Sequence, residues 1–183
     1  EVKQTITACR EIAKENGSPD AQLFRRMLKA YEAATEKGMH LYATGCYYDN
    51  NPYDFWYEGL ADLANSMINF DNNNSYSNSS YQIWINMKLY PALLLYYAAG
   101  MSCIWTKNYK NLYKLMHETK IRPQYHEISV ALSKLHPRLV SDNVHDNSEH
   151  FNLPQNSKTP SNVHLLKILR PCLHLGSIRA FVG

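Results

Sequence analysis

The stretch YPALLLYYAAGMSCIW, from Tyr90 to Trp105, holds sixteen residues and not one charged side chain. As a helix it would be about 24 Å long at 1.5 Å per residue. That is shorter than the hydrocarbon core of a bilayer, about 30 Å thick, which takes about 20 residues to cross. Lys88 and Lys107 bound the stretch on either side. We therefore predict a buried central helix rather than a membrane span.

The composition favours helices around this stretch. The chain has 183 residues, of which 14 are tyrosines and only 7 are glycines, and it lacks Val-rich alternating runs. The length fits one domain with enough apolar material for a core. The net charge of +3 is milder than that of most dedicated nucleic-acid binders, which argues against that class.

Helical spacing of apolar residues predicts the surrounding elements. Residues 4–16 form a first helix, residues 19–48 a long one, and residues 51–70 a third. Gly38 and Gly45 fall on one face of the long helix. Either a neighbouring helix approaches closely there, or the helix breaks at Gly38.

Two further amphipathic helices are expected after the uncharged stretch. In residues 107–120 the spacing places Tyr109, Leu112, Tyr113 and Met116 on the inward face. Residues 125–135 form a short helix before a His-Pro step. We predict an all-α helical domain over residues 1–136, packed around residues 90–105. A polar loop or disordered connector follows over 137–162, and an apolar C-terminal segment over 163–183 packs on the domain.

The four cysteines, at positions 9, 46, 103 and 172, are far apart and form no CxxC pair. This pattern indicates free, buried thiols in a reducing compartment. The chain begins with Glu1 and shows no basic-then-apolar leader, so we expect a cytoplasmic protein without a signal peptide. Its end at "GSIRAFVG" suggests a piece of a longer protein.

A tyrosine-rich region provides candidate binding residues: Tyr47, Tyr48, Tyr53 and Tyr57. Exposed tyrosines suit protein interfaces, because the ring is apolar and the hydroxyl is polar. A place in the core is an equally good interpretation of these residues.

Lysines recur beside aromatic residues in the helix expected at residues 107–120. Lys107, Lys110 and Lys114 form a stripe next to Tyr109 and Tyr113. Lysines interleaved with aromatic rings can bind single-stranded nucleic acid. Because the helical spacing turns both tyrosines inward, we expect a solvated face here instead.

Two weaker patterns point to catalysis. Asp54, Glu58 and Asp62 are spaced four residues apart and could line one helix face for Mg²⁺, although such a face is more often only solvated. Arg138 and His145 are separated by six residues, the loose spacing of HEPN-type ribonucleases. No P-loop, dinucleotide fingerprint or nucleophile elbow is present, so we expect no cofactor and no catalysis from this chain.

Three segments of the chain together resemble a known kind of helical region. They are FRRMLKAYEAATEKGMHLYATGCYY, WYEGLADLAN and YPALLLYYAAGMSCIWTKNYKNLYKLM, within residues 23–117. Their order is similar to the accessory helical region of large prokaryotic SIR2-type and NTPase proteins of anti-phage defence. The resemblance implies a sensor or assembly module whose chemistry lies elsewhere in a longer polypeptide. Its partner would be another protein or another domain of the same polypeptide. The alternative function is that of a metal-dependent or HEPN-like ribonuclease.

Overall fold

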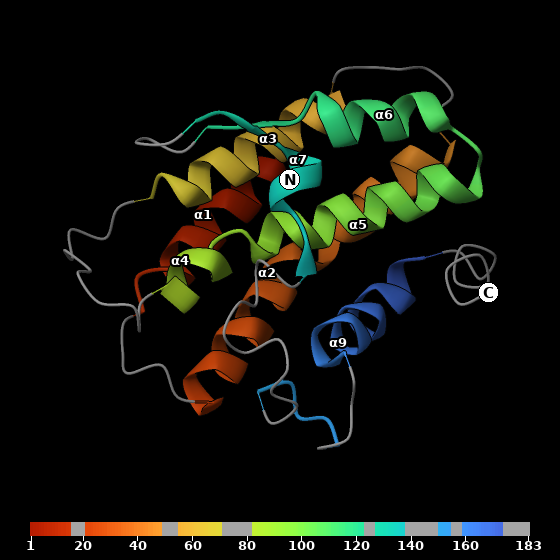
Figure 1. Ribbon diagram of the computed structural model, residues 1–183. Coiled ribbons are helices and arrows are strands. Elements are labelled where there is room, and N and C mark those ends of the chain that lie inside the picture. Colours follow the sequence, from red (N-terminus) through yellow and green to blue (C-terminus); the bar gives the residue numbers. More distant parts are fainter. Residues whose placement is uncertain are drawn as a thin grey trace.

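The computed structural model describes seven stretches of the chain: residues 1–15, 21–48, 55–70, 82–122, 127–137, 150–154 and 159–173. It confirms the all-α prediction, with one very small hairpin added (Figure 1). The elements are α1 (Val2–Ile12), α2 (Ala21–Tyr48), α3 (Phe55–Ile68), α4 (Gln82–Met87), α5 (Tyr90–Trp105), α6 (Tyr109–His117), β1 (Lys120–Ile121), β2 (Ser129–Val130), α7 (Ala131–Lys134), α9 (Pro160–Leu169) and the short 3-10 helix η2 (Arg170–Cys172).

The uncharged stretch forms α5 and is the centre of the molecule, as predicted. Twelve of its sixteen residues are buried. Figure 1 shows α5 between α6 above it and α9 below it, with α2 running alongside. Within the described part of the chain, none of the helices is both long and apolar enough to cross a bilayer.

Helix α2 is continuous through Gly38, so the alternative of a break at this glycine is ruled out. It runs parallel to α5, since Glu32 meets Tyr90 near one end and Gly38 meets Leu95 further along. A Cβ atom on Gly38 would lie 3.0 Å from Leu95 Cδ2. The glycine therefore permits the close approach of α5 that the sequence predicted.

The connection from α5 to α6 is fixed by backbone hydrogen bonds. The Lys107 N–H donates to the Ile104 carbonyl, and the Asn108 N–H donates to the Cys103 carbonyl. This is the Schellman pattern that ends many helices, with Lys107 at the left-handed position (φ 57°). The Asn108 side chain then accepts from the Asn111 N–H and begins α6.

The orientation of α6 differs from the prediction. Asn111 and Leu115 are its buried residues, whereas Tyr109 and Tyr113 are 62 % and 59 % exposed. The helix docks through Leu112, whose Cδ1 lies 3.8 Å from where a Cβ of Gly100 would be. The leucines reach the small residues of α5, and the tyrosines are turned to the outer face.

Residues 125–135 do not form the single helix that was expected. Residues 129–130 are β2, which pairs antiparallel with β1, and only Ala131–Lys134 is helical. Asn65 of α3 supports the hairpin: its Nδ2 donates to the Lys120 carbonyl at 2.9 Å, and its Oδ1 accepts from the Arg122 N–H at 2.6 Å. The side chain of Asn65 thus satisfies the backbone of an edge strand.

Parts of the polar span 137–162 pack on the helices. Phe151 is buried, and its ring meets the Phe24 ring edge-on with centroids 5.6 Å apart. Helix α9 begins at Pro160, inside this span. Residues 138–149, 155–158 and 174–183 lie outside the described residues.

Candidate functional site

Helices α2 and α5 finish side by side on the right of Figure 1, and large apolar side chains lie in their last turns and at the start of α3. The residues are Tyr47, Tyr48, Phe55, Ile104 and Trp105, and we name this set the aromatic end. Tyr48 is 68 % exposed and Phe55 is 55 % exposed, and Ile104 and Trp105 are also exposed. The Tyr47 ring packs against that of Tyr48.

Contacts between α2 and α3 are made by Trp56, the neighbour of Phe55 at the start of α3. The Phe55 and Trp56 rings meet with centroids 5.1 Å apart. Trp56 in turn packs on Tyr42 and against Gly45, one turn before Tyr48. Of the predicted tyrosine set, Tyr48 is exposed and Tyr47 is half-buried beside it.

The other two tyrosines of that set are not part of the aromatic end. Tyr57 is half-buried, and the Lys114 ammonium lies 5.5 Å from its ring centroid, a cation–π contact between α3 and α6. Tyr53 lies outside the described residues.

The lysine stripe divides into exposed and packed members. Lys107 and Lys110 are exposed, while Lys114 is half-buried over Tyr57. Tyr109 and Tyr113 stand beside the lysines on the outside of α6, contrary to the inward orientation that the spacing predicted. The expectation of only a solvated face depended on that inward orientation, so it no longer holds.

Within the described residues, the structure assembles neither the predicted acidic site nor the predicted ribonuclease site. Glu58 and Asp62 are exposed on α3, and Asp54 lies outside the described residues, as do Arg138 and His145. The part of the chain that the structure describes holds no group of three His, Cys, Asp or Glu side chains placed to bind a metal ion.

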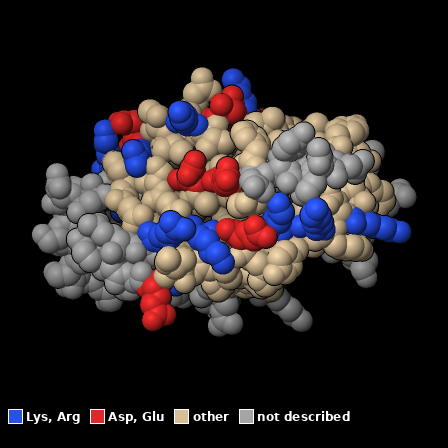
Figure 2. Space-filling view, turned by 90° about the horizontal axis from the view of Figure 1, so that it is seen from above, with Lys and Arg blue, Asp and Glu red and all other residues tan. Residues whose placement is uncertain are grey.

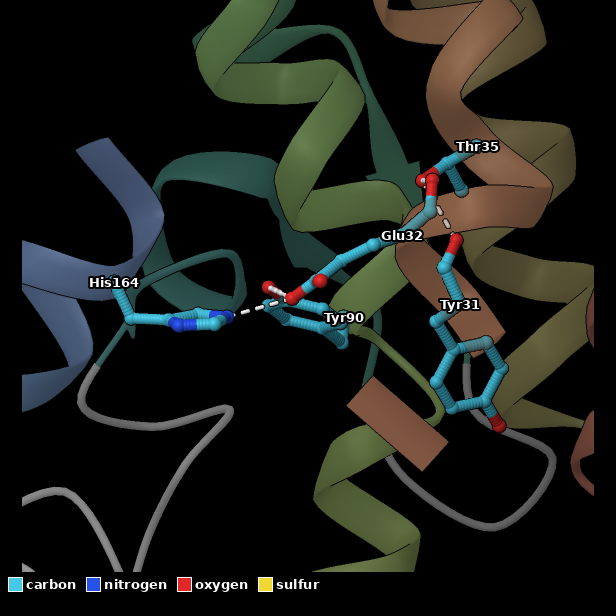
Figure 3. Close-up of polar contacts among 5 residues, drawn as sticks. All are labelled: Tyr31, Glu32, Thr35, Tyr90 and His164. Carbon is cyan, nitrogen blue, oxygen red and sulfur yellow. Dashed lines mark hydrogen bonds and ion pairs between the residues drawn. The ribbon is translucent and has the colours of Figure 1, made fainter. Parts of the chain in front are cut away.

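A polar centre that was not predicted from the sequence joins three helices (Figure 3). Glu32 of α2 accepts a hydrogen bond from the Tyr90 hydroxyl at 3.0 Å. The same oxygen, Oε1, lies 2.6 Å from His164 Nε2 of α9. The Glu32 and His164 side chains are 13 % and 15 % exposed, and Tyr90 is buried. Burial and the neighbouring carboxylate raise the pKa of Tyr90 well above its usual value.

An apolar pocket adjoins this polar centre. Tyr90, Ser161 and His164 provide its polar lining. Its apolar lining comes from Phe24, Leu28, Met87, Leu93, Pro137, Phe151 and Leu165. The pocket has about 310 Å³ of empty space, open solvent included, which is small for a ligand site.

The geometry of the polar centre suits a structural role. A carboxylate that orients an imidazole is also an arrangement of general-base catalysis, which needs a reacting group within hydrogen-bond reach. Tyr90 is the group that shares the carboxylate here, and its raised pKa keeps the hydroxyl protonated. The centre therefore acts as a polar link that holds α9 onto α2 and α5.

Weak signals for the polar centre were present in the sequence. Glu32 directly follows Tyr31 on the buried stripe of the long helix, and His164 interrupts the apolar segment VHLLKIL. A charged residue beside a buried stripe needs a partner. Because the partners are 58 and 132 residues away along the chain, spacing could not identify them.

All four cysteines are free and buried, as predicted. Burial raises the pKa of Cys9 to about 12 and that of Cys172 to about 11. Such thiols are poor nucleophiles, because the thiolate is the reactive form.

Comparison with known proteins provides no relative: no protein-family model, curated protein or solved structure matches this chain.

Proposed function

We propose that this chain is a non-catalytic interaction or sensor module that binds a protein partner, or another domain of its own polypeptide, through the aromatic end. The observation that carries the proposal is that Tyr48, Ile104 and Trp105 are exposed at the ends of α2 and α5, which finish side by side, and that Phe55 is exposed at the start of α3. Exposed large apolar side chains at one end of a folded protein are characteristic of interaction sites.

The chemistry of these residues suits a protein partner. Tyrosine, phenylalanine and tryptophan are enriched at the cores of protein interfaces, where their large rings lose contact with water at little cost in side-chain entropy. Tyr47 adds a hydroxyl beside the Tyr48 ring. The aromatic end is set on the rigid ends of helices whose inner residues form the core.

The resemblance to accessory helical regions of large prokaryotic defence proteins agrees with this proposal. In that setting the module would lie in the bacterial cytoplasm and respond to, or assemble with, a second component. The chemistry would belong to another part of a longer polypeptide.

The proposal is tested by site-specific photocrosslinking in the cells that make the protein. A benzophenone amino acid replaces Tyr48 or Phe55, and replaces Lys29, an exposed residue of α2, as the control. We expect one protein, or one further domain, to be crosslinked from positions 48 and 55 but not from position 29. Equal crosslinking from all three positions would contradict the proposal.

A second assay separates this function from the ribonuclease alternative. The chain is incubated with single-stranded RNA and Mg²⁺, beside the variants Arg138→Ala and His145→Ala. We expect no cleavage above that of a buffer control. Cleavage by the unaltered chain that both variants lose would replace the interaction module with an enzyme.

A further inference from the structure

The outer face of α6 combines aromatic rings with basic side chains. Tyr109 and Tyr113 are the most exposed rings in this helix, and Lys110 lies between them in the chain and is also exposed. His117 follows Tyr113 by one turn, and the two rings lie 4.7 Å apart at 30°. We name Tyr109, Lys110, Tyr113 and His117 the α6 outer face.

Basic charge is concentrated around this face. From Trp105 to Arg122 the chain has four lysines, one arginine and a single acidic residue, Glu118. The excess of positive charge in this short segment is larger than the net charge of the whole chain, which is +3. Figure 2 shows basic side chains in a row on the right of the upper face of the molecule, where Figure 1 places α6.

The spacing of the rings suits successive bases. Residues four apart on a helix are about 6 Å apart along its axis. Tyr109, Tyr113 and His117 follow this spacing, so they form a ladder of rings along one face. The Tyr113 and His117 rings lie too close together for a base to enter between them, so bases would reach the Tyr109 and Tyr113 rings from their exposed sides, and aromatic stacking of this kind accepts any base.

The lysines stand where they can meet phosphates. Lys110 is on the outer face, and Lys107 is held at the start of α6 by the left-handed backbone of the Schellman motif. Lys114 borders the face on the α3 side. Acidic side chains also occur nearby: Glu118 follows the end of the helix, and Glu58 and Asp62 are exposed on α3.

We propose that the α6 outer face binds single-stranded nucleic acid, with Tyr109 and Tyr113 stacking on bases and Lys107 and Lys110 meeting phosphates. This proposal does not depend on the protein contact proposed for the aromatic end, which adjoins the α6 outer face through Trp105 and the turn that holds Lys107. It rests on the exposed rings and on the complementary charge of a polyanion.

The binding is measured by fluorescence anisotropy of labelled 20-nucleotide oligo-U and oligo-dT, at low and moderate salt. We expect saturable binding that weakens as salt rises, because phosphate contacts release counterions. Each of Tyr109→Ala and Tyr113→Ala should weaken it by on the order of tenfold. Tyr109→Phe and Tyr113→Phe should keep it, because a phenyl ring still stacks.

Matched variants separate stacking from simple attraction. Lys107→Gly removes a charge at a position where glycine suits the backbone, and Lys110→Glu reverses one; both should reduce the salt dependence of binding. Lys29→Glu changes an exposed lysine of α2 outside both proposed sites and should leave binding unaltered. Circular dichroism of each variant checks its fold.

Three results would overturn the proposal. The first is no saturable binding to either oligonucleotide at low salt. The second is binding that Lys110→Glu abolishes but Tyr109→Ala and Tyr113→Ala do not change, since that would be attraction without stacking. The third is equal affinity for duplex DNA or heparin, which would mark the face as a general polyanion surface or a contact for an acidic protein.

Discussion

Gly45 of α2 lies directly against the indole ring of Trp56 of α3, so closely that a Cβ atom on Gly45 would overlap ring atoms Cζ2 and Cη2. The ring also packs edge-on against Tyr42. This contact joins the two helices beneath the aromatic end and explains why a glycine is tolerated inside a 28-residue helix.

Gly45→Ala should therefore destabilise the protein. The added methyl group displaces Trp56, and overpacking of this kind costs about 1–3 kcal/mol in the free energy of unfolding. Gly100→Ala of α5 is the matched control, because its Cβ would meet only Leu112 Cδ1 at 3.8 Å. Alanine there should stabilise the helix by up to about 1 kcal/mol. Urea denaturation of the two variants measures both values, and equal losses would contradict the assigned packing.

The link between Glu32 and His164 should hold α9 in place. His164→Ala removes the 2.6 Å contact and leaves a partly buried carboxylate with Tyr90 as its described side-chain partner. Loss of a hydrogen bond to a charged group costs about 1.5–3 kcal/mol. Compared with the unaltered protein, the variant should have lower thermal stability. Its amide hydrogen exchange should become faster in Pro160–Leu169 but change less in α5.

The control for that variant is His40→Ala, which changes an exposed histidine of α2. It should leave the exchange of α9 unchanged. If His164→Ala behaved like His40→Ala, the polar centre would not be what holds α9 to the other helices.

The sequence predicted those parts of the fold that depend on long apolar stretches and on small residues between helices. An uncharged run as long as 90–105 can only be buried in a small helical domain, and the two glycines of α2 indicated a close neighbour. It failed at α6, because tyrosine is amphipathic and fits either side of a helix. The capping by Asn108 and the contact of Leu112 with Gly100 decided the orientation instead.

The remaining features depend on contacts between distant parts of the chain. Strands of two residues have no periodicity to detect, and the β1–β2 pairing relies on Asn65 from α3. The polar centre likewise takes one residue from each of three helices, α2, α5 and α9. Such pairings become visible only when the helices have been placed.

Two buried tyrosines should respond differently to loss of the hydroxyl. The Tyr31 hydroxyl is buried and has no hydrogen-bond partner within the described residues, whereas the Tyr90 hydroxyl donates to Glu32. Tyr31→Phe should leave the free energy of unfolding unchanged or raise it, and Tyr90→Phe should lower it by about 1.5–3 kcal/mol. Chemical denaturation of both variants compares them directly, and a larger loss for Tyr31→Phe would contradict these environments.

The cysteines should be unreactive in the folded protein. All four are buried, and the raised pKa values of Cys9 and Cys172 leave almost no thiolate at pH 8. Ellman's reagent should therefore modify the native protein slowly and detect four thiols promptly after denaturation in guanidinium. A thiol that reacts within seconds in the native state would show that one of these sites is open to solvent.

Stability should fall in alkaline solution. The Cys9 and Cys172 thiols and the Tyr96 hydroxyl are neutral when protonated, and burial raises their pKa values to about 12, 11 and 12. Below pH 9 these groups are protonated in both states, so their contribution is complete. Above pH 9 for the thiols, and above pH 10 for the tyrosine, the unfolded chain loses protons first. The free energy of unfolding therefore falls as pH rises, by up to about 1.4 kcal/mol per pH unit for the fully buried Cys9 and by less for Cys172 and the half-buried Tyr96, whose charges water screens in part. Urea denaturation at pH 8 and pH 10.5 measures the loss. Cys9→Ala should make the loss of unfolding free energy between pH 8 and pH 10.5 smaller, because one titrating thiol is gone. A stability that stays constant between the two pH values would mean that these side chains are not buried.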